Sequence, residues 1–337
     1  MLIKSLKLIS FRSFKKAEFN FDRVTQIVGD NGTGKTNILE AIRLLSVLKS
    51  FRAKIENEMI NYIGDYLSVI GEVETVENNH KEVSVYLDKK QKIAKINKTK
   101  HRFSEFIGFI PTVLFSSSDL EIVSGPPNFR RRFIDSAICQ YNHVYLRDLL
   151  ELKAILKQRN SLLEQIKNNL RDTSTLEIWN NKLIEINAKI YFERERFFES
   201  ISSILKSLDS SITITPILAQ LTLEMLDKAL RNDLRYLSTT IGPHHDDFKI
   251  LLDKKDASIY GSRGEQKTAI IILKIAEKRT LEKHLKGETA ILLLDDIFSE
   301  LDAQNQKKIL DLSDDGQVIL TSIGKQKVGG KSKCLLL

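Results

Sequence analysis

The sequence predicts a two-lobed α/β fold in which a helical block interrupts a mixed β-sheet core. Three observations predict it: a strand–loop–helix pattern close to the N-terminus, a stretch over 129–208 with almost no Gly or Pro, and strand patterns that return near 248. The 337 residues suffice for two lobes with a sizeable core. We place one lobe in 1–108 and 287–337, and a helical second lobe in 109–286.

Individual elements follow from the period of the apolar residues. Alternation over 3–10 and 16–21 is typical of half-buried strands, and helical spacing over 37–48 predicts a helix after a short strand at 25–28. A Lys-rich turn at 88–92 indicates a meander. Further strands are expected at 67–73, 83–87, 93–96, 248–252, 289–295 and 317–321, a helical hairpin within 129–208, and helices at 268–285 and 303–312.

Composition limits the kinds of binding partner and the cellular compartment that we expect for this protein. The net charge of +8 suits a polyanionic partner, although a solvated basic surface explains it equally well. The two cysteines, Cys139 and Cys334, are far apart, which argues against a disulfide framework and for a reducing compartment. No stretch approaches the ~18 apolar residues of a membrane span, and the basic N-terminus lacks the apolar core of a signal peptide. We therefore expect a cytoplasmic protein.

A phosphate-binding loop is the strongest motif in the chain. The segment from Gly29 to Thr36 matches G-x-x-x-x-G-K-[ST], with an apolar strand before it and a helix after it. Glycines let successive backbone N–H groups converge on phosphate oxygens, and the helix N-terminus adds partial positive charge. We expect Lys35 to reach the β- and γ-phosphates of ATP and the Thr36 hydroxyl to bind Mg²⁺. The nucleotide-binding residues expected here are Gly29, Asp30, Asn31, Gly32, Thr33, Gly34, Lys35, Thr36 and Asn37.

Two adjacent carboxylates end an apolar strand late in the chain. In the run A-I-L-L-L-D-D, Asp295 stands where a metal-binding carboxylate belongs and Asp296 where a base that activates water belongs. An apolar strand ending in a polar turn is the alternative. Because a phosphate-binding loop is also present, we assign catalytic roles to Asp296 and Lys35 and metal binding to Thr36 and Asp295.

A second glycine-containing turn opens a long helix. Such a turn at a helix N-terminus is an anion site. Because the Lys35 loop already provides one phosphate site, the second indicates a separate half-site; an ordinary helix start is the alternative. Its residues are Ser262, Arg263, Gly264 and Glu265. Farther on, Ser299-Glu300-Leu301-Asp302 follows the aspartate pair, with Asp302 as a helix N-cap.

Together these motifs resemble the ABC/SMC ATPases, and more closely the RecF family of bacterial DNA-repair proteins, over essentially the whole chain. The resemblance also includes the signature turn with Arg263 and an Asp-Asp pair. The other segments that carry it are Phe11–Phe14, Gly34–Ile42, Ser50–Arg52, Phe115–Leu120, Gly125-Pro126, Arg130–Asp135 and Gly242–Phe248.

The resemblance implies an ABC/SMC-type ATPase head and an ATP-dependent homodimer. Each nucleotide would lie between Lys35 of one copy and Ser262 of the other. It further implies binding to gaps or single-strand/double-strand junctions in DNA, and cooperation with RecR and RecO in loading RecA. ATP and Mg²⁺ would be the cofactors, and hydrolysis would be a weak, DNA-stimulated switch.

Several positions depart from the usual ABC pattern. Arg263 replaces the first signature glycine, and Asp296 is one methylene shorter than the usual glutamate, which predicts slow turnover. No glutamine follows the strand at 112–115. Thr321-Ser322 stands where many ABC ATPases carry a histidine, so sensing of the γ-phosphate there is in doubt.

Basic and histidine clusters leave alternatives open. A lysine-rich stretch either contacts DNA phosphates or protects a solvated strand edge; its candidate DNA contacts are Lys89, Lys90, Lys92, Lys95, Lys98 and Lys100. The arginines at 130–132 contact nucleotide, a partner copy or Asp135. His244 and His245 are interpreted as structural or close to nucleotide rather than as metal ligands.

The C-terminal tail is unusual. The residues from Cys334 to Leu337 match the C-a-a-X lipidation pattern, with lysines upstream. This modification needs a eukaryotic cytosol, whereas the preceding chain resembles a bacterial protein. We interpret the tail as frayed and basic.

Two other functions compete with the repair factor. One is the nucleotide-binding subunit of an ABC transporter, which the ~80-residue helical block and the basic charge disfavour. The other is a scaffold that binds nucleotide without hydrolysing it. True SMC function is disfavoured by length alone, because the sequence has no long coiled-coil arm.

Overall fold

The computed structural model describes residues 1–337 except 78, 286, 297–305, 307–315 and 326–331. Two compact units are present: Met1–Asp119 with Ile270–Leu337, and Leu120–Ala269. Each is described by itself. The expected motif Ser299–Asp302 and the expected helix 303–312 lie outside the described residues.

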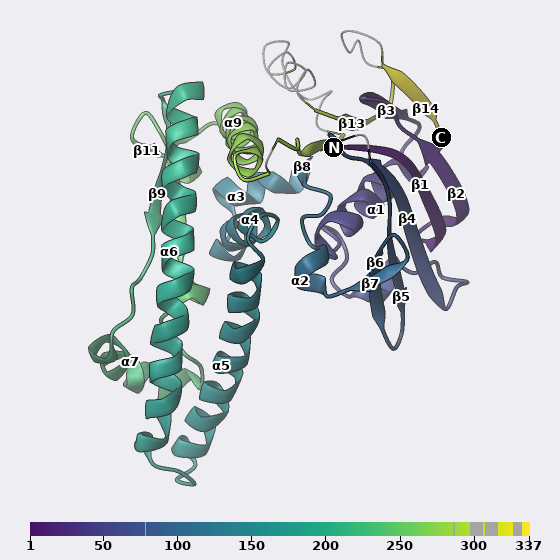
Figure 1. Cartoon of the computed structure of the whole chain (residues 1–337). Coiled ribbons are helices and arrows are strands. Elements are labelled where there is room, and N and C mark those ends of the chain that lie inside the picture. The colour runs from purple at the N-terminus through teal and green to yellow at the C-terminus, as the bar shows by residue number, and fades with distance from the viewer. Residues whose placement is uncertain (78, 286, 297–305, 307–315, 326–331) are drawn as a thin grey trace. The chain divides into compact units, whose positions relative to one another are not determined.

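The first unit contains an antiparallel sheet of six strands in the order β2-β1-β4-β5-β6-β7 (Figure 1). Alternate residues of these strands, such as Leu8, Val69 and Val85, are buried on one face, here called the inner face. The alternation therefore has the period of two that the sequence predicts. The strands are β1 (Leu2–Phe11), β2 (Phe14–Asn20), β4 (Tyr66–Glu74), β5 (His80–Asp88), β6 (Lys92–Ile96) and β7 (Thr99–His101).

A parallel sheet of five strands forms the second layer of this unit, in the order β14-β3-β13-β12-β8. Helix α1 (Lys35–Val47) contacts strands of both sheets, which explains why it is buried on almost every side. The strands are β3 (Val24–Val28), β8 (Thr112–Ser116), β12 (Ile291–Asp295), β13 (Val318–Ser322) and β14 (Lys333–Leu336). The same unit contains the short elements η1 (Glu56–Met59) and α2 (Phe103–Phe106).

The prediction of a frayed C-terminal tail is wrong for the part of the tail that the structure describes. Lys333–Leu336 forms β14, which pairs in parallel with β3, and the Leu337 N–H donates to the Val28 carbonyl at 2.9 Å. The pairing satisfies backbone groups that a frayed tail would leave to water. The sequence pattern hid this strand because only four residues form it.

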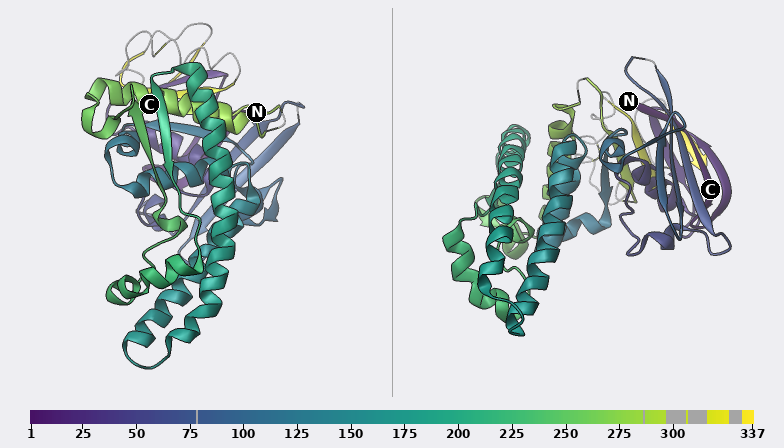
Figure 2. Two further views of the ribbon diagram at one scale, coloured as in Figure 1. Left: turned by 90° about the vertical axis from the view of Figure 1, so that its left-hand side faces the viewer. Right: turned by 60° about the horizontal axis from the view of Figure 1, so that its bottom comes forward.

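The second unit is built on a helical pair and a small sheet. Helices α5 (His143–Lys167) and α6 (Glu177–Leu208) run side by side in every view (Figures 1 and 2), confirming the expected hairpin. The sheet has the order β11-β10-β9. Its strands are β9 (Ile212–Ile217), β10 (Asp247–Leu252) and β11 (Lys255–Asp256), and the other helical elements of this unit are α3 (Glu121–Ser124), α4 (Pro127–Cys139), η3 (Thr173–Leu176), α7 (Leu223–Tyr236), η4 (Pro243–His245) and α8 (Ala257–Tyr260). Residues of both units contribute to η2 (Ser117–Leu120) and α9 (Arg263–Glu282).

Ion pairs, some of them only partly buried, connect the arginine-rich helix α4 with α6 and with the Gly242–Phe248 segment. Arg130 pairs with Asp247 at 2.5 and 3.0 Å, and not with Asp135. Asp135 instead accepts from Arg194 at 2.9 Å, and the same guanidinium donates to Asp246 at 2.7 Å. Two segments that the resemblance singled out are therefore folding partners within this unit.

His244 and His245 have a structural environment. Their Nε2 atoms lie 2.8 and 3.2 Å from the Thr239 carbonyl oxygen, and their rings lie 4.3 Å apart. No cluster of three or more His, Cys, Asp or Glu side chains suited to a metal is found in the described residues.

The stability of the fold is expected to depend on His244 at mildly acid pH. Burial lowers the pKa of His244 to about 4 from the ordinary 6.5, so the folded state favours the neutral ring. The resulting stabilisation is present above pH 6.5 and is lost as the pH falls through 4. Chemical denaturation of His244→Gln should give a wild-type-minus-variant difference in unfolding free energy that is flat above pH 6.5 and falls below it. A difference independent of pH would contradict this prediction.

Candidate nucleotide site

The phosphate-binding loop connects β3 to α1, as the sequence predicts. Gly32 and Gly34 have φ of 88° and 106°, angles that other residues rarely adopt. A Cβ on Gly34 would lie 2.8 Å from the Phe14 ring, and one on Gly29 would lie 3.0 Å from the Leu337 carbonyl oxygen. The loop is thus shaped both by its own backbone and by the close approach of β14 and Phe14.

Lys35 is almost fully buried and lies against the loop. Its Nζ donates to the Gly29 carbonyl at 2.8 Å and to the Asp30 carbonyl at 3.0 Å. The ammonium therefore lies among the backbone groups that surround a bound phosphate in such loops.

The threonine of the loop meets the aspartate expected to bind metal. Thr36 Oγ1 donates to Asp295 Oδ1 at 2.8 Å, although the two residues are 259 positions apart. β3 and β12 both pair with β13 in parallel, so their carboxyl ends reach the same edge of the sheet. A hydroxyl and a carboxylate at this distance are ligands of the kind that Mg²⁺ prefers, so the residues fit the expected metal.

The aspartate pair is held in place by Thr321, a contact that the sequence did not reveal. Its Oγ1 accepts from the Asp296 N–H at 2.8 Å and lies 3.1 and 3.2 Å from Asp295 Oδ1 and Asp296 Oδ1. Burial raises the pKa of Asp295, and the negative charge of Asp296 acts in the same direction. Thr321 lies next to the last residue of β13, which pairs with β12, so a hydroxyl contacts both carboxylates where the ABC pattern leads us to expect a histidine.

The backbone explains the shorter carboxylate at 296. Asp296 has φ of 54°, in the left-handed region, where Asp and Asn are several-fold enriched over other non-glycine residues. A glutamate there would lack this local preference.

Arginines at 12 and 52 flank the loop helix. Arg12 donates to both carboxylate oxygens of the buried Glu40, at 2.8 and 2.6 Å, and Ser50 also donates to Glu40. Arg52 Nη1 donates to the Asn37 side chain at 3.2 Å, and its positive charge partly offsets the rise in the pKa of Asp295 that burial causes. Sequence reasoning assigned no role to Arg52 itself; its place in the Ser50–Arg52 segment, which carries part of the resemblance, was the available signal.

Asp119 lies three residues after the end of β8, in the segment where no glutamine occurs. Asp119 Oδ2 accepts from the Ser116 N–H at 2.6 Å, and its Oδ1 lies 3.2 Å from the ammonium of the buried Lys274. Ser116 pairs with Asp295 across the sheet. The segment that follows β8 is therefore anchored by an ion pair to α9 next to the aspartate strand.

The residues of the expected signature turn lie at the start of α9, with Ser262 directly before the helix, and are exposed. The Ser262 N–H and Oγ donate to Glu265 Oε2 at 2.8 and 2.7 Å, and the Glu265 N–H donates back to Ser262 Oγ at 3.3 Å. These bonds form a capping box and lower the pKa of Glu265. A Cβ on Gly264 would meet no heavy atom of the described residues within 4 Å. Packing against the described residues therefore does not require glycine at this position in the first turn of α9.

Comparison with known proteins places this chain in a family. The model of the RecF/RecN/SMC N-terminal domain matches residues 2–335. A DNA replication and repair protein RecF from Caldanaerobacter subterraneus subsp. tengcongensis is 35% identical, with 98% of this chain and 96% of that protein aligned. This chain belongs to the RecF family. A second RecF, from Agathobacter rectalis, is 36% identical over 96% of this chain and 92% of its own length.

Solved structures agree with this RecF membership. A structure described as the recombination mediator protein RecF-ATPrS in the RecFOR pathway has a TM-score of 0.90 and 34% identity, covering all of this chain and 96% of its own. An Smc head domain from Pyrococcus furiosus, at 20% identity and a TM-score of 0.50, covers 96% of this chain and 89% of its own and shares the fold. The ABC/SMC-type head predicted from the sequence is thereby confirmed. No helix in the described ranges has the length and apolar character needed to cross a membrane.

Exchanging Gly34 for alanine should damage the loop, and Gly264→Ala provides a matched control. At Gly34 the positive φ and the Phe14 contact predict a loss of about 1–3 kcal/mol of unfolding free energy and of ATP binding. At Gly264 the open space and helical conformation predict unchanged or slightly higher stability. Thermal melts without ATP compare the stability of the two variants, and titration with ATP measures the loss of binding in Gly34→Ala. Equal destabilisation by the two alanines would contradict the argument.

Proposed function

We propose that this chain is an ATP-gated DNA-binding protein of replication and recombinational repair. The observation that carries the proposal is the Thr36–Asp295 hydrogen bond of 2.8 Å, which joins the phosphate loop to the aspartate strand. Relatives named DNA replication and repair protein RecF, and a solved structure described as RecF-ATP in the RecFOR pathway, support it. By the same likeness the partners are RecO and RecR, the outcome is loading of RecA, and the location is the cytoplasm.

In this mechanism each site residue has a separate role in binding or hydrolysing ATP. The backbone of Gly29–Gly34 and the Lys35 ammonium bind the phosphates of ATP. Thr36 and Asp295 would hold Mg²⁺, which would supply positive charge to offset the charge that develops on the phosphate. Asp296 orients the attacking water and takes its proton. Thr321 fixes both carboxylates, and Arg52 adds positive charge beside Asp295.

The second half of each site comes from another copy of the chain. Ser262, Arg263, Gly264 and Glu265 are exposed, and the first turn of a helix favours anions. The unexplained glycine at 264 leaves room for a nucleotide phosphate to approach the backbone. ATP therefore promotes dimerisation, and slow hydrolysis ends it.

DNA binding by wild type tests the proposal. Fluorescence anisotropy with a labelled gapped duplex should show tight binding with ATP and weak binding with ADP or without nucleotide. Binding that is equal in all three conditions would contradict an ATP-gated function. If ATP promotes binding but is never hydrolysed, the non-hydrolysing scaffold replaces the switch.

A further inference from the structure

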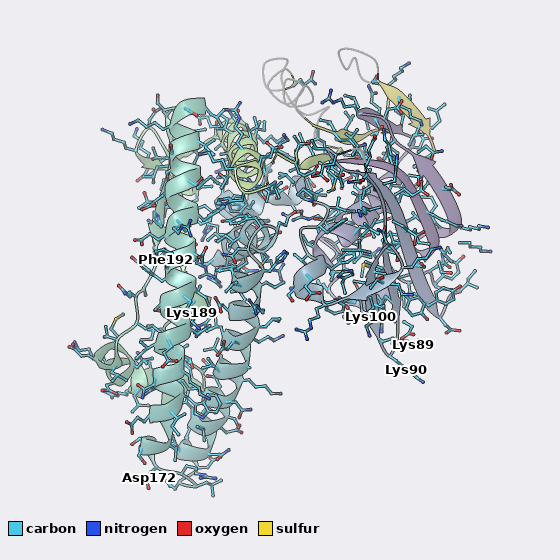
Figure 3. All side chains as sticks on the ribbon, viewed as in Figure 1. Lys89, Lys90, Lys100, Asp172, Lys189 and Phe192 are labelled. Atoms are coloured by element: carbon cyan, nitrogen blue, oxygen red, sulfur yellow. The ribbon has the colours of Figure 1, made fainter. Side chains whose placement is uncertain are left out.

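The lysine-rich stretch separates into distinct groups once its strands are placed. Lys92 points to the inner face, where it contacts Glu56 and the Leu48 carbonyl. Lys89 and Lys90 lie at the tip of the β5–β6 hairpin (Figure 3), and Lys98 lies in the next turn. Only Lys95 and Lys100 of the six lie on strands and face away from the inner face.

Lys95 and Lys100 are direct partners on the antiparallel ladder of β6 and β7. Side chains of directly opposite residues lie on the same face, and like charges placed so are destabilising. Protection of a sheet edge explains lysines on β7, the edge strand. It does not explain Lys95, because β6 lies inside the sheet between β5 and β7.

Two tyrosines continue this face toward the centre of the sheet. Ile93, two residues before Lys95, pairs with Tyr86 on β5. The Tyr86 ring stacks on Tyr66 of β4 with centroids 5.5 Å apart, and Tyr66 is 42% exposed. These residues form a continuous outer-face stripe across four strands: Tyr66, Tyr86, Ile93, Lys95 and Lys100.

Charge confines an anionic ligand to this part of the sheet. Residues 89–102 contain seven Lys and Arg side chains and no Asp or Glu. Asp88 is an acidic residue next to the stripe: it pairs with Tyr66, and its carboxylate accepts from the Tyr86 hydroxyl at 3.1 Å and from the Lys90 and Gln91 N–H groups. Farther along β4 and β5, Glu72 and Glu82 pair on the same face and would repel a polyanion.

We propose that the outer-face stripe binds the unpaired strand of gapped DNA. Lys95 and Lys100 contact backbone phosphates, and an unpaired base stacks on the exposed Tyr66 ring. Single-stranded DNA is the occupant because its bases offer free faces for stacking, which the bases inside a duplex do not. The inference rests on the proposed DNA-binding function and adds where the single-stranded part lies.

The test compares anisotropy of labelled oligo(dT) and of a blunt duplex, both with ATP. Tyr66→Ala should weaken oligo(dT) binding about tenfold, and Tyr66→Phe, which keeps the aromatic face, should restore it. Lys95→Gln with Lys100→Gln should lower the slope of log affinity against log salt by about 1.4 for oligo(dT). The charge-matched control is Lys153→Gln with Lys157→Gln, on the exposed side of α5. Blunt-duplex binding should change little in all of these variants.

The outcomes separate this inference from the proposed function. Removal of the Lys95–Lys100 repulsion should leave the melting temperature equal or higher, so loss of binding cannot come from unfolding. If wild type binds both DNAs while the stripe variants bind oligo(dT) no worse than the control pair, the inference fails alone. Equal losses on oligo(dT) and duplex would also overturn it, because the stripe would then recognise charge or another partner. If wild type binds no DNA with ATP, the proposed function fails as well.

Discussion

Asp296→Asn is expected to slow ATP hydrolysis by about 10²–10⁴-fold, the usual contribution of a general base. The substitution keeps the size of the side chain and the preference for the left-handed backbone that Asp296 adopts. The amide oxygen still faces the Thr321 hydroxyl, which lies 3.2 Å from Asp296 Oδ1. Folding and ATP binding should therefore persist while proton transfer is lost.

Single-turnover hydrolysis and nucleotide binding should be measured on the same preparation. Asp295→Asn is the matched control, because it should weaken Mg²⁺-dependent ATP binding rather than slow the chemical step alone. Hydrolysis by Asp296→Asn at the wild-type rate would remove Asp296 from the mechanism and leave the base unassigned.

Lys35→Ala is expected to weaken ATP binding by about 10–100-fold, since hydrogen bonds from a charged group contribute about 1.5–3 kcal/mol. The side chain also donates to the Gly29 and Asp30 carbonyls, so the variant should unfold somewhat more easily without nucleotide. Isothermal titration with ATP measures the first effect, and melting without ATP measures the second.

Lys49→Ala is the matched control for charge. Lys49 is exposed shortly after the end of the same helix, and its loss should alter neither property. ATP affinity of Lys35→Ala within twofold of wild type would contradict the assigned role of Lys35.

The phosphate loop could be predicted from the sequence because its function depends on consecutive residues. Glycine spacing, the lysine and the flanking strand and helix are all local, and Gly32 and Gly34 have the positive φ that the motif requires. The aspartate pair was predictable for the same reason, as the end of an apolar strand. Whether these residues perform the assigned roles stays a prediction.

Contacts between distant segments could not be predicted in this way. Thr321 contacts the aspartates because β13 pairs with β12, and no pattern near Thr321 indicates that pairing. Arg130 pairs with Asp247 rather than with Asp135, because β10 contacts α4 and so places Asp247 beside Arg130. β14 was missed because a four-residue strand at a sheet edge has too short a pattern to recognise.

The side of the sheet on which each residue of the lysine-rich stretch lies could not be predicted from the sequence either. Composition identified the basic charge, but only the strand register separates the inward Lys92 from the outward Lys95 and Lys100. The register also places Tyr66 and Tyr86 on the face of those two lysines.

The central claim is that ATP joins two copies of this chain through the Lys35 loop and the Ser262 turn. Light scattering coupled to size exclusion tests it most directly, on wild type and Asp296→Asn, with and without ATP and gapped DNA. Without nucleotide we expect the monomer mass of 38.6 kDa, and for Asp296→Asn with ATP we expect twice that mass. Gly264→Ala should abolish this ATP-dependent dimer. A monomer in every condition, or a dimer that forms equally without ATP, would contradict it.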